Sequence, residues 1–423
     1  MASRENQARW RDRKRGNTSA PHCQCGKRLR KESKDLCRSC WLKTLEGRAY
    51  NQHRVASQNQ SKADLAKSAK LIASRFTREL GFVHLRALEA SEAKRELEVL
   101  PGIGFVHFHY RRDRQTTIYS LAVLPEHQRQ GWGRLLFYRV LCRAIENGSD
   151  RIFLKCPEDL VGANKFYRNL GFQLTGIDPG KRRSLNCWEY KIDLPLLFFC
   201  NGGGRSPYDT IAKQEGWKLG IQSTDKKGNH QFPTEHVEMI DNEWGEGYKH
   251  DHHVNLIKSQ KPLIATVKDL VSLDQLPEIL KHAKEIAPYC GRVVVIPKIM
   301  TWLPNDYWIW LGFSVPSTHG STPVPPSWFG NRFVHLLGGS PRLQAEYAKQ
   351  MNVVSMDAKT SMLLASKGKS TWQGVSGGTK IKPGCYESFR ISVQKQKEYW
   401  HILKNQPWAN DPLFQNQEYP IWE

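Results

Sequence analysis

The sequence predicts an α/β protein built from several domains. The chain has 423 residues, of which 39% are hydrophobic and 10% aromatic. That length is about three times a usual domain, and that composition supports packed cores, so a wholly disordered chain is excluded. Strand-like and helix-like patterns alternate in residues 81–195 and again in residues 236–405. Such alternation is typical of sheets covered by helices.

The remaining segments divide the chain further. Residues 1–20 are polar and basic and predict a flexible arm, whereas residues 43–80 contain helix-forming residues and predict a linker helix. Residues 196–235 are rich in Gly, Asn and Lys and predict a junction, and residues 406–423 predict an irregular tail. Because no run of 18 apolar residues occurs, we expect no membrane-spanning helix and a cytoplasmic protein.

The charge is strongly positive and unevenly placed. Lys and Arg number 63 against 41 Asp and Glu, which gives a net charge of +22. Residues 1–80 hold 20 of the basic residues and 7 of the acidic ones. A basic arm attracts polyanions, so nucleic acid is the expected partner, DNA rather than RNA. The alternative is that the arm only keeps the protein soluble.

Residues 21–42 contain four closely spaced cysteines: Cys23, Cys25, Cys37 and Cys40. Two pairs of thiolates at this spacing predict a tetrahedral Zn²⁺ site. His22 stands next to Cys23, so the fourth ligand is either of these two residues. The segment resembles the small zinc ribbons of phage-type nucleases and other DNA-acting proteins.

The clearest pattern lies in the first α/β region. A predicted strand at 116–124 is followed by the loop Gln128-Arg129-Gln130-Gly131-Trp132-Gly133-Arg134 and by a helical pattern at 135–145. Backbone N–H groups at a helix N-terminus favour anions, and Gly131 and Gly133 let a diphosphate approach the main chain closely. The sequence therefore predicts an anion-binding loop here.

A second pattern follows, with a predicted strand at 150–156 and a helix at 159–170 that leads into Gly171-Phe172. In this order the two patterns resemble the GNAT acyltransferase superfamily over residues 81–194. The resemblance implies a mixed α/β sheet domain that transfers an acyl group from acetyl-CoA, or a related acyl-CoA, to an amine.

The resemblance also implies roles for single residues. Tyr167 would protonate the leaving thiolate as a general acid, and Asn164 would hold the cofactor. Leu121 and Val123 would pair through their backbones with the pantetheine arm. The residues that would bind the CoA diphosphate are Arg129, Gln130, Gly131, Trp132, Gly133 and Arg134. The general base has no fixed position in the superfamily, and His107, His109, Glu158 and Asp159 are candidates.

The C-terminal region contains short, continuously apolar segments such as 292–297 and 333–337, separated by helical patterns. Continuous apolar strands joined by helices predict a parallel sheet whose functional residues lie at the strand C-termini. The turn Gly338-Gly339-Ser340-Pro341 follows one such strand and suits a phosphate or a ribose.

Residues 335–341, with the following strand that ends at Asp357, resemble the tRNA-guanine transglycosylase barrel and its phage DNA-modifying relatives. The resemblance implies a TIM-barrel-like β/α domain, complete or incomplete. It also implies Asp357 as the nucleophile at the sugar C1′ and Asp241 as a second carboxylate that assists proton transfer. The sequence departs from that family because only Cys385 follows residue 290, so the family's zinc site after the barrel is absent.

These predictions combine into a main hypothesis and two alternatives. The main one is an acyltransferase that modifies an amine on a nucleic acid base, in a protein of phage or bacterial type. The first alternative is base exchange by the C-terminal domain. The second is a nucleic-acid-binding protein whose enzyme-like domains are inert.

Overall fold

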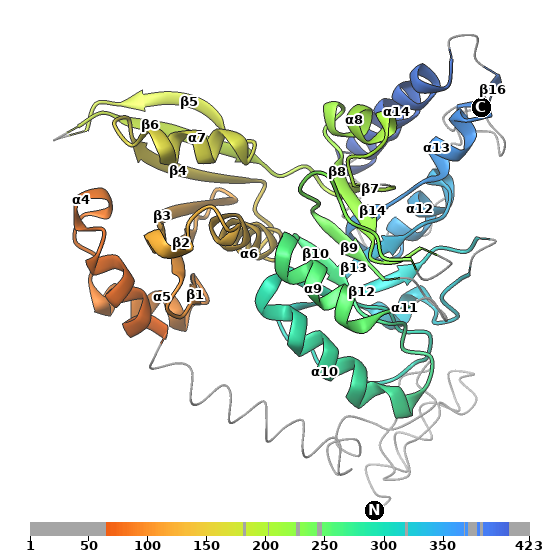
Figure 1. Cartoon of the computed structure of the whole chain (residues 1–423), viewed down its shortest axis with the longest axis horizontal. Coiled ribbons are helices and arrows are strands. Elements are labelled where there is room, and N and C mark those ends of the chain that lie inside the picture. Colours follow the sequence, from red (N-terminus) through yellow and green to blue (C-terminus); the bar gives the residue numbers. More distant parts are fainter. Residues whose placement is uncertain are drawn as a thin grey trace, which may run out of the picture.

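The computed structural model shows two lobes, a six-stranded sheet domain and a barrel domain (Figure 1). It describes residues 65–405 apart from 181–182, 202, 226–228, 243–247, 318–319, 368, 371–378 and 381–383. The predicted zinc ribbon, with Cys23, Cys25, Cys37 and Cys40, lies outside the described residues, as do the arm at 1–20 and the tail at 406–423. No helix in the described part of the chain is long and apolar enough to cross a membrane.

The first domain is a mixed sheet in the order β1-β2-β3-β4-β6-β5. Only β3 and β4 run parallel, and the other neighbours are antiparallel. The strands are β1 (Leu97–Leu100), β2 (Gly104–Tyr110), β3 (Gln115–Val123), β4 (Arg151–Pro157), β5 (Gln173–Asp178) and β6 (Leu185–Lys191). Strands β3 and β4 agree with the predicted ones, 116–124 and 150–156, to within one residue.

Helices cover both faces of this sheet. α6 (Trp132–Glu146) packs on one face, where Val106, Phe108 and Ile118 share a core with it, and α7 (Val161–Asn169) adds Tyr167 to the same core. The other face packs against α5 (Leu85–Ala93) and a helical segment at 65–74, through Phe105 and Ala122. α4 (Thr77–Leu80) lies between these two helical segments in the chain.

The segment at 65–74 corrects the prediction of a linker. It is helical as predicted, but Ala66, Ala69, Ile72 and Ala73 are buried against the sheet. The alanines and the isoleucine recur at helical spacing, which places them on one face of the helix. This part of the chain therefore belongs to the sheet domain.

The second domain is a closed parallel barrel of eight strands in chain order, so the barrel fold predicted from the sequence is complete. The strands are β7 (Leu196–Cys200), β8 (Lys218–Gln222), β9 (Met239–Asp241), β10 (Ile264–Thr266), β11 (Arg292–Val295), β12 (Ile309–Ser314), β13 (Phe333–Leu337) and β14 (Asn352–Asp357). The helices around it are α8 (Pro207–Gln214), α9 (His250–Gln260), α10 (Leu276–Ile286), α11 (Pro326–Phe329), α12 (Pro341–Ala348), α13 (Thr360–Ala365) and α14 (Cys385–Asn405). A two-stranded ribbon, β15 (Lys369–Ser370) and β16 (Thr379–Lys380), precedes α14.

The prediction of a junction at 196–235 was wrong, because this segment supplies β7, α8 and β8 of the barrel. The glycine-rich stretch after β7 is a strand-to-helix loop in which Gly203 and Gly204 have positive φ. A signal for the helix was present in the sequence: Ser206 and Asp209 form a reciprocal capping box at the start of α8.

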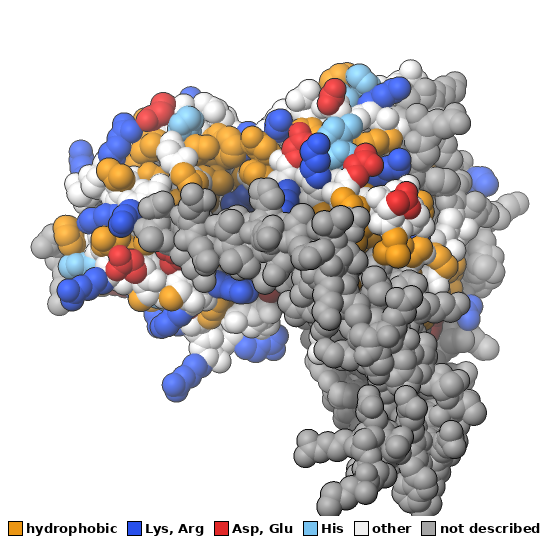
Figure 2. Space-filling view, turned by 90° about the horizontal axis from the view of Figure 1, so that it is seen from below, with side chains coloured by type: hydrophobic (Ala, Val, Ile, Leu, Met, Phe, Trp, Pro, Cys, Tyr) orange, Lys and Arg blue, Asp and Glu red, His pale blue; other side chains and the backbone are white. Residues whose placement is uncertain are grey.

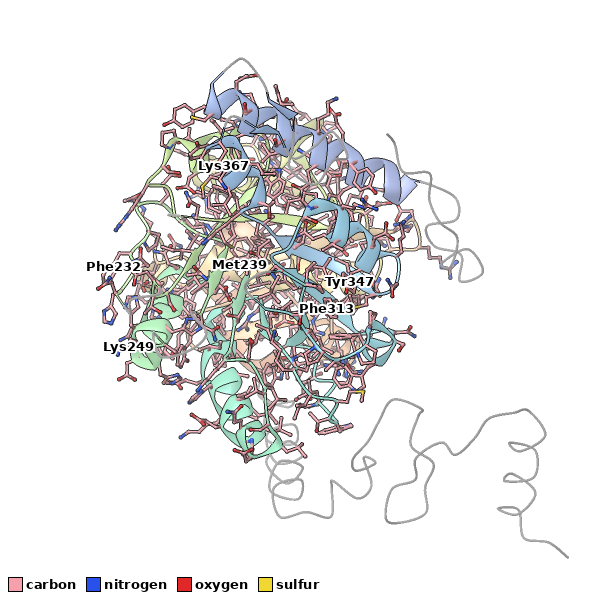
Figure 3. The ribbon with its side chains drawn as sticks, turned by 90° about the vertical axis from the view of Figure 1, so that its right-hand side faces the viewer. Phe232, Met239, Lys249, Phe313, Tyr347 and Lys367 are labelled. Carbon is pink, nitrogen blue, oxygen red and sulfur yellow. The ribbon has the colours of Figure 1, made fainter. Side chains whose placement is uncertain are left out.

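Side chains alternate between the inside of the barrel and the outer helices. Met239 lies near its centre in Figure 3 and belongs to the inner core, whereas Phe313 packs outward on Tyr347 of α12 with ring centroids 4.6 Å apart. Gly220 leaves room inside for Cys200, whose sulfur would lie 2.2 Å from any Cβ at that position.

Helix α6 lies across the N-terminal end of the barrel and joins the two domains. Glu146 accepts hydrogen bonds from Arg292 at 2.6 and 2.8 Å and from Trp310 at 2.9 Å. Arg139 of the same helix donates to the carbonyl groups of Ala287 and Pro288. Because the inner barrel residues and the core of the sheet domain form one hydrophobic cluster, the two lobes are packed as a single body.

Candidate active sites

Strands β3 and β4 separate halfway along their length. Their parallel pairing covers Gln115 to Ile118 on β3 and Arg151 to Leu154 on β4, and it stops there although both strands continue. The part of β3 from Tyr119 to Val123 therefore has an edge without a strand partner on the β4 side. Leu121 and Val123, predicted to pair with the pantetheine arm, lie on this free edge.

The loop that follows β3 presents unpaired backbone N–H groups. Gly131, with φ of +86°, is the N-cap of α6, and no side chain caps the helix. No described residue accepts a hydrogen bond from the N–H groups of residues 129–134. Free N–H groups at the start of a 15-residue helix favour an anionic ligand. The structure thus places all six predicted diphosphate-binding residues around one helix N-terminus.

Two glycines keep this N-terminus open to a ligand. The left-handed φ of Gly131 is one that other residues adopt at a cost. At Gly133, a Cβ would lie 3.2 Å from the ring of Phe166 on α7. The bulky Trp132 side chain lies toward the barrel, with its ring centroid 6.1 Å from that of Tyr289.

Lys261 of the barrel domain reaches the same loop, which the sequence did not indicate. Its Nζ lies 4.3 Å from the centroid of the Trp132 ring, and its Cδ lies 3.4 Å from the position of a Cβ at Gly131. Its side chain donates to the carbonyl of Lys258, and burial lowers its pKa. Among the described residues, no carboxylate pairs with it.

Tyr167 lies on α7 with its side chain in the core beneath the sheet. Its ring packs on Phe166 and Phe172 at 5.4 and 5.7 Å between centroids. Burial raises the pKa of its hydroxyl group, and the neighbouring Cys156 adds to that effect. At neutral pH the hydroxyl keeps its proton, as a tyrosine of ordinary pKa also does and as a general acid must.

Asn164 makes contacts that position the neighbouring strands. Its side-chain amide donates to the carbonyl groups of Pro157 and Leu160, and its oxygen accepts from Asn186 and Trp188. These four bonds use both ends of the side chain. Asn164 therefore fixes the end of β4 beside the separated strands, and its predicted contact with the cofactor stays a prediction.

A second group of functional side chains lies at the carboxyl end of the barrel. Asp241 ends β9 and Asp357 ends β14, and both face the inside of the barrel next to Cys200. Asp241 accepts a hydrogen bond from Thr266 at 2.8 Å. Burial, followed by the charge of Asp357, raises the pKa of Asp241 to about 7. The structure thus brings together the two carboxylates that the sequence predicted from separate motifs.

Asp357 is held by the strand before it. Its Oδ1 accepts the backbone N–H of Gly338 at 3.1 Å and lies 3.5 Å from Nε2 of His335. His335 is fully buried, and its Nδ1 bonds to the hydroxyl of Ser355. Lys359 follows β14 and donates to Gln222 across the barrel mouth. His335 and Lys359 are site residues that the sequence reasoning missed.

Two family models match the chain. Residues 99–172 match the acetyltransferase (GNAT) family, and residues 212–401 match a family of unknown function, DUF6610. Residues 99–172 therefore have the GNAT N-acetyltransferase fold. A search of curated proteins found no match.

The solved structures that match include acetyltransferases, and three of these each overlay on about a quarter of this chain. Nourseothricin acetyltransferase is 27% identical over 21% of this chain and 57% of its own, with a TM-score of 0.21. The ribosomal-protein-S18-alanine N-acetyltransferase of Escherichia coli is 20% identical over 30% of this chain and 88% of its own, with a TM-score of 0.26. A putative acetyltransferase of Salmonella typhimurium, solved with acetyl-CoA, is 20% identical over 26% of this chain and 75% of its own, with a TM-score of 0.23. The chain thus spans just over half the length of the nourseothricin enzyme.

Proposed function

We propose that the GNAT domain transfers an acetyl group from acetyl-CoA to an amine on a nucleic acid base. The observation that carries the proposal is the set of free N–H groups at residues 129–134, beside the edge of β3 that β4 leaves unpaired. The free N–H groups suit a diphosphate, and the unpaired edge of β3 suits an extended arm that offers amide groups, such as pantetheine. Together they match the two ends of an acyl-CoA.

Tyr167 completes this chemistry. As the amine nitrogen forms a bond to the thioester carbonyl carbon, the C–S bond breaks and sulfur takes a proton from the Tyr167 hydroxyl. A tyrosine hydroxyl of ordinary pKa holds this proton at neutral pH, and burial raises the pKa of Tyr167 further. A positioned general acid contributes about 10²–10⁴-fold to such a reaction.

Charge supports a nucleic acid acceptor. The chain has a net charge of +22, and basic residues exceed acidic ones by 13 in residues 1–80. On the face of the sheet lobe seen in Figure 2, Lys and Arg side chains predominate over Asp and Glu. Cys23, Cys25, Cys37 and Cys40, with His22 as an alternative ligand, would add a Zn²⁺-folded ribbon to this basic segment. We propose DNA over RNA, in a protein of phage or bacterial type.

The experiment incubates the full chain with radiolabelled acetyl-CoA and one of three acceptors: single-stranded DNA, RNA or a lysine-containing peptide. Label in nucleosides, located by mass spectrometry, supports the proposal, and Tyr167→Phe should lower it at least 100-fold. Label in the peptide alone would contradict the nucleic acid acceptor. Salt-sensitive DNA binding without any acetyl-CoA binding would instead favour the inert alternative.

A second activity is proposed for the barrel, because Asp241 and Asp357 meet at its carboxyl end, where barrel enzymes carry their active sites. In base exchange, an Asp357 oxygen would bond to the sugar C1′ while the bond from C1′ to the base nitrogen breaks. Asp241, protonated below about pH 7, would supply the proton to the departing base. The incoming base would reverse these steps.

This second activity is tested by release of a labelled base from DNA or RNA. Asp357→Asn should abolish the release and leave acetylation within twofold of wild type. Tyr167→Phe should lower acetylation at least 100-fold and leave the release within twofold of wild type. Release that persists in Asp357→Asn would contradict the role of the barrel carboxylates.

A further inference from the structure

A cluster of polar side chains lies on the sheet face opposite Tyr167. It consists of Ser91 on α5, Glu96 before β1, His107 and His109 on β2, and Tyr119 on β3. The face is the one that packs against α5, since Phe105 and Ala122, which lie on it, belong to that core. Tyr167 belongs to the core on the α6 face. The general acid and this cluster therefore lie on opposite sides of the separated strands.

Glu96 and His109 form a carboxylate–imidazole pair. Glu96 Oε2 lies 2.7 Å from Nδ1 of His109, and its Oε1 accepts the backbone N–H of Tyr110 at 3.0 Å. Glu96 is 5% exposed, so its carboxylate is fixed by these two contacts. Because a carboxylate only accepts, His109 carries its proton on Nδ1 and has its lone pair on Nε2. No described residue forms a hydrogen bond with that Nε2.

The pair lies where the strands separate. Thr117, the β3 partner of His109, sits in the second-last paired position of β3 and β4. Tyr119, the first residue beyond that pairing, is the extra residue of a bulge, since His107 pairs with Ser120 and Phe108 with Ile118. The ring centroids of His109 and Tyr119 are 4.9 Å apart. A bulge here bends β3 and turns the Tyr119 side chain onto the face of the cluster.

His107 is unsuited to accept a proton. Its Nε2 bonds to the hydroxyl of Ser91 at 2.9 Å, and the residue is buried. Burial, followed by the neighbouring His109, lowers the pKa of His107 to about 4 although Glu96 opposes this. Arg111 is a further charged residue at the cluster and donates to the hydroxyl of Tyr119. Within the cluster, only His109 combines a free ring nitrogen with an orienting carboxylate.

We propose that His109, oriented by Glu96, is the general base of acetyl transfer and that the acceptor amine enters from the α5 face. The amine nitrogen bonds to the thioester carbonyl carbon and gives a proton to Nε2 of His109, directly or through one water. The C–S bond breaks, and sulfur takes the Tyr167 proton on the other face. The imidazolium then returns its proton to solvent, and Tyr167 regains one. This inference rests on the proposed acetyl transfer.

The test compares wild type with His109→Gln and Glu96→Gln, using His84→Gln as a matched control because His84 is an exposed histidine of the same domain. Thiol release from acetyl-CoA is followed from pH 5 to 9, with an adenine-rich single-stranded DNA as the amine and with water alone. We expect His109→Gln to lower kcat at least 100-fold, to keep acetyl-CoA affinity within twofold and to lose the acidic limb of the pH profile. Glu96→Gln should also lower kcat and keep acetyl-CoA affinity within twofold, because it leaves the imidazole in place without the carboxylate that orients it.

Rescue separates a catalytic role from a structural one. Added imidazole should restore part of the rate of His109→Ala and leave His84→Gln unchanged. Wild-type rate and pH profile in His109→Gln would overturn the assignment. Wild type that binds no acetyl-CoA, or that binds it without raising thiol release above buffer, would contradict the proposed function and with it this inference.

Discussion

Asp241 and Asp357 illustrate what burial does to single residues in this protein. The sequence placed Asp357 at the end of a predicted strand, and the structure confirms that position; it predicted no strand for Asp241, which ends β9. A resemblance had assigned the two carboxylates to one reaction, but the sequence could not predict that Cys200 would lie beside them, because it comes from another strand of the barrel. Lys261 was missed for the same reason: it is 130 residues from Gly131 in the chain and next to it in space.

The raised pKa of Asp241 predicts how stability depends on pH. The folded protein binds this proton more tightly than the unfolded chain. The protonated group therefore contributes fully to the free energy of unfolding below about pH 4, and this contribution is lost as pH rises to about 7. We expect Asp241→Asn to raise the free energy of unfolding at pH 8 by about 1 kcal/mol or more and to change it little at pH 4. Urea unfolding at both pH values measures this. An equal effect at both would contradict the buried, coupled carboxyl.

Lys261 should contribute to acetyl-CoA binding, because its ammonium group lies at the anion-binding loop without a carboxylate partner among the described residues. We expect Lys261→Met to weaken acetyl-CoA binding three- to tenfold, about 1 kcal/mol. Calorimetric titration measures the affinity, with the exposed Lys281→Met as control. Unchanged affinity in Lys261→Met would show that the barrel takes no part in the acyl-CoA site.

Among the elements, the sequence predicted β3, α6, β4 and α7 well, because in each of them the apolar residues recur at a regular spacing and the pattern stops at a recognisable residue. It could not show that β3 and β4 pair over only four residues, since pairing depends on contacts between distant segments. The sequence also did not show that α6 contacts the barrel as well as the sheet. A signal was present, because ten of its fifteen residues are buried, and an apolar pattern on all sides predicts a helix covered on both faces.

The contact between α6 and the barrel depends on a buried ion pair. Arg292 is 1% exposed and bonds to both carboxylate oxygens of Glu146. Glu146→Ala would leave this guanidinium without its partner in the interior, which costs about 3 kcal/mol. Thermal unfolding measures the loss. Glu126→Ala, which breaks the exposed pair with Arg75, is the matched control and should leave the midpoint nearly unchanged. Equal effects of the two substitutions would contradict the account of the interface.

For the whole molecule, the shared helix places the two candidate sites at opposite ends of the barrel. The loop at Gly131 lies at the N-terminal end, beside Lys261, and the carboxylates lie at the other end. Barrel strands of about five residues separate the ends by roughly 15 Å. The two proposed reactions would therefore have separate sites, and a nucleic acid would have to move to meet both. Nothing in the order of the motifs along the chain predicts this arrangement.

Because the two lobes share one hydrophobic cluster, we expect them to unfold together. Calorimetry should show one unfolding transition. Acetyl-CoA at a hundred times its Kd should raise the free energy of unfolding of the two lobes together by about 2.7 kcal/mol. Two transitions, with only one shifted by acetyl-CoA, would show that the lobes are independent.

Calorimetric titration of the full chain with acetyl-CoA tests the acyl-CoA site most directly. Wild type should bind one equivalent, and Arg129→Glu, which puts a carboxylate into the loop, should bind at least tenfold more weakly. Arg95→Glu is the matched control, because Arg95 is also exposed and shares the positive φ of Arg129, 61° against 60°, but lies outside the loop. Binding that is absent in wild type, or equal in the two variants, would contradict an acyl-CoA site at the start of α6.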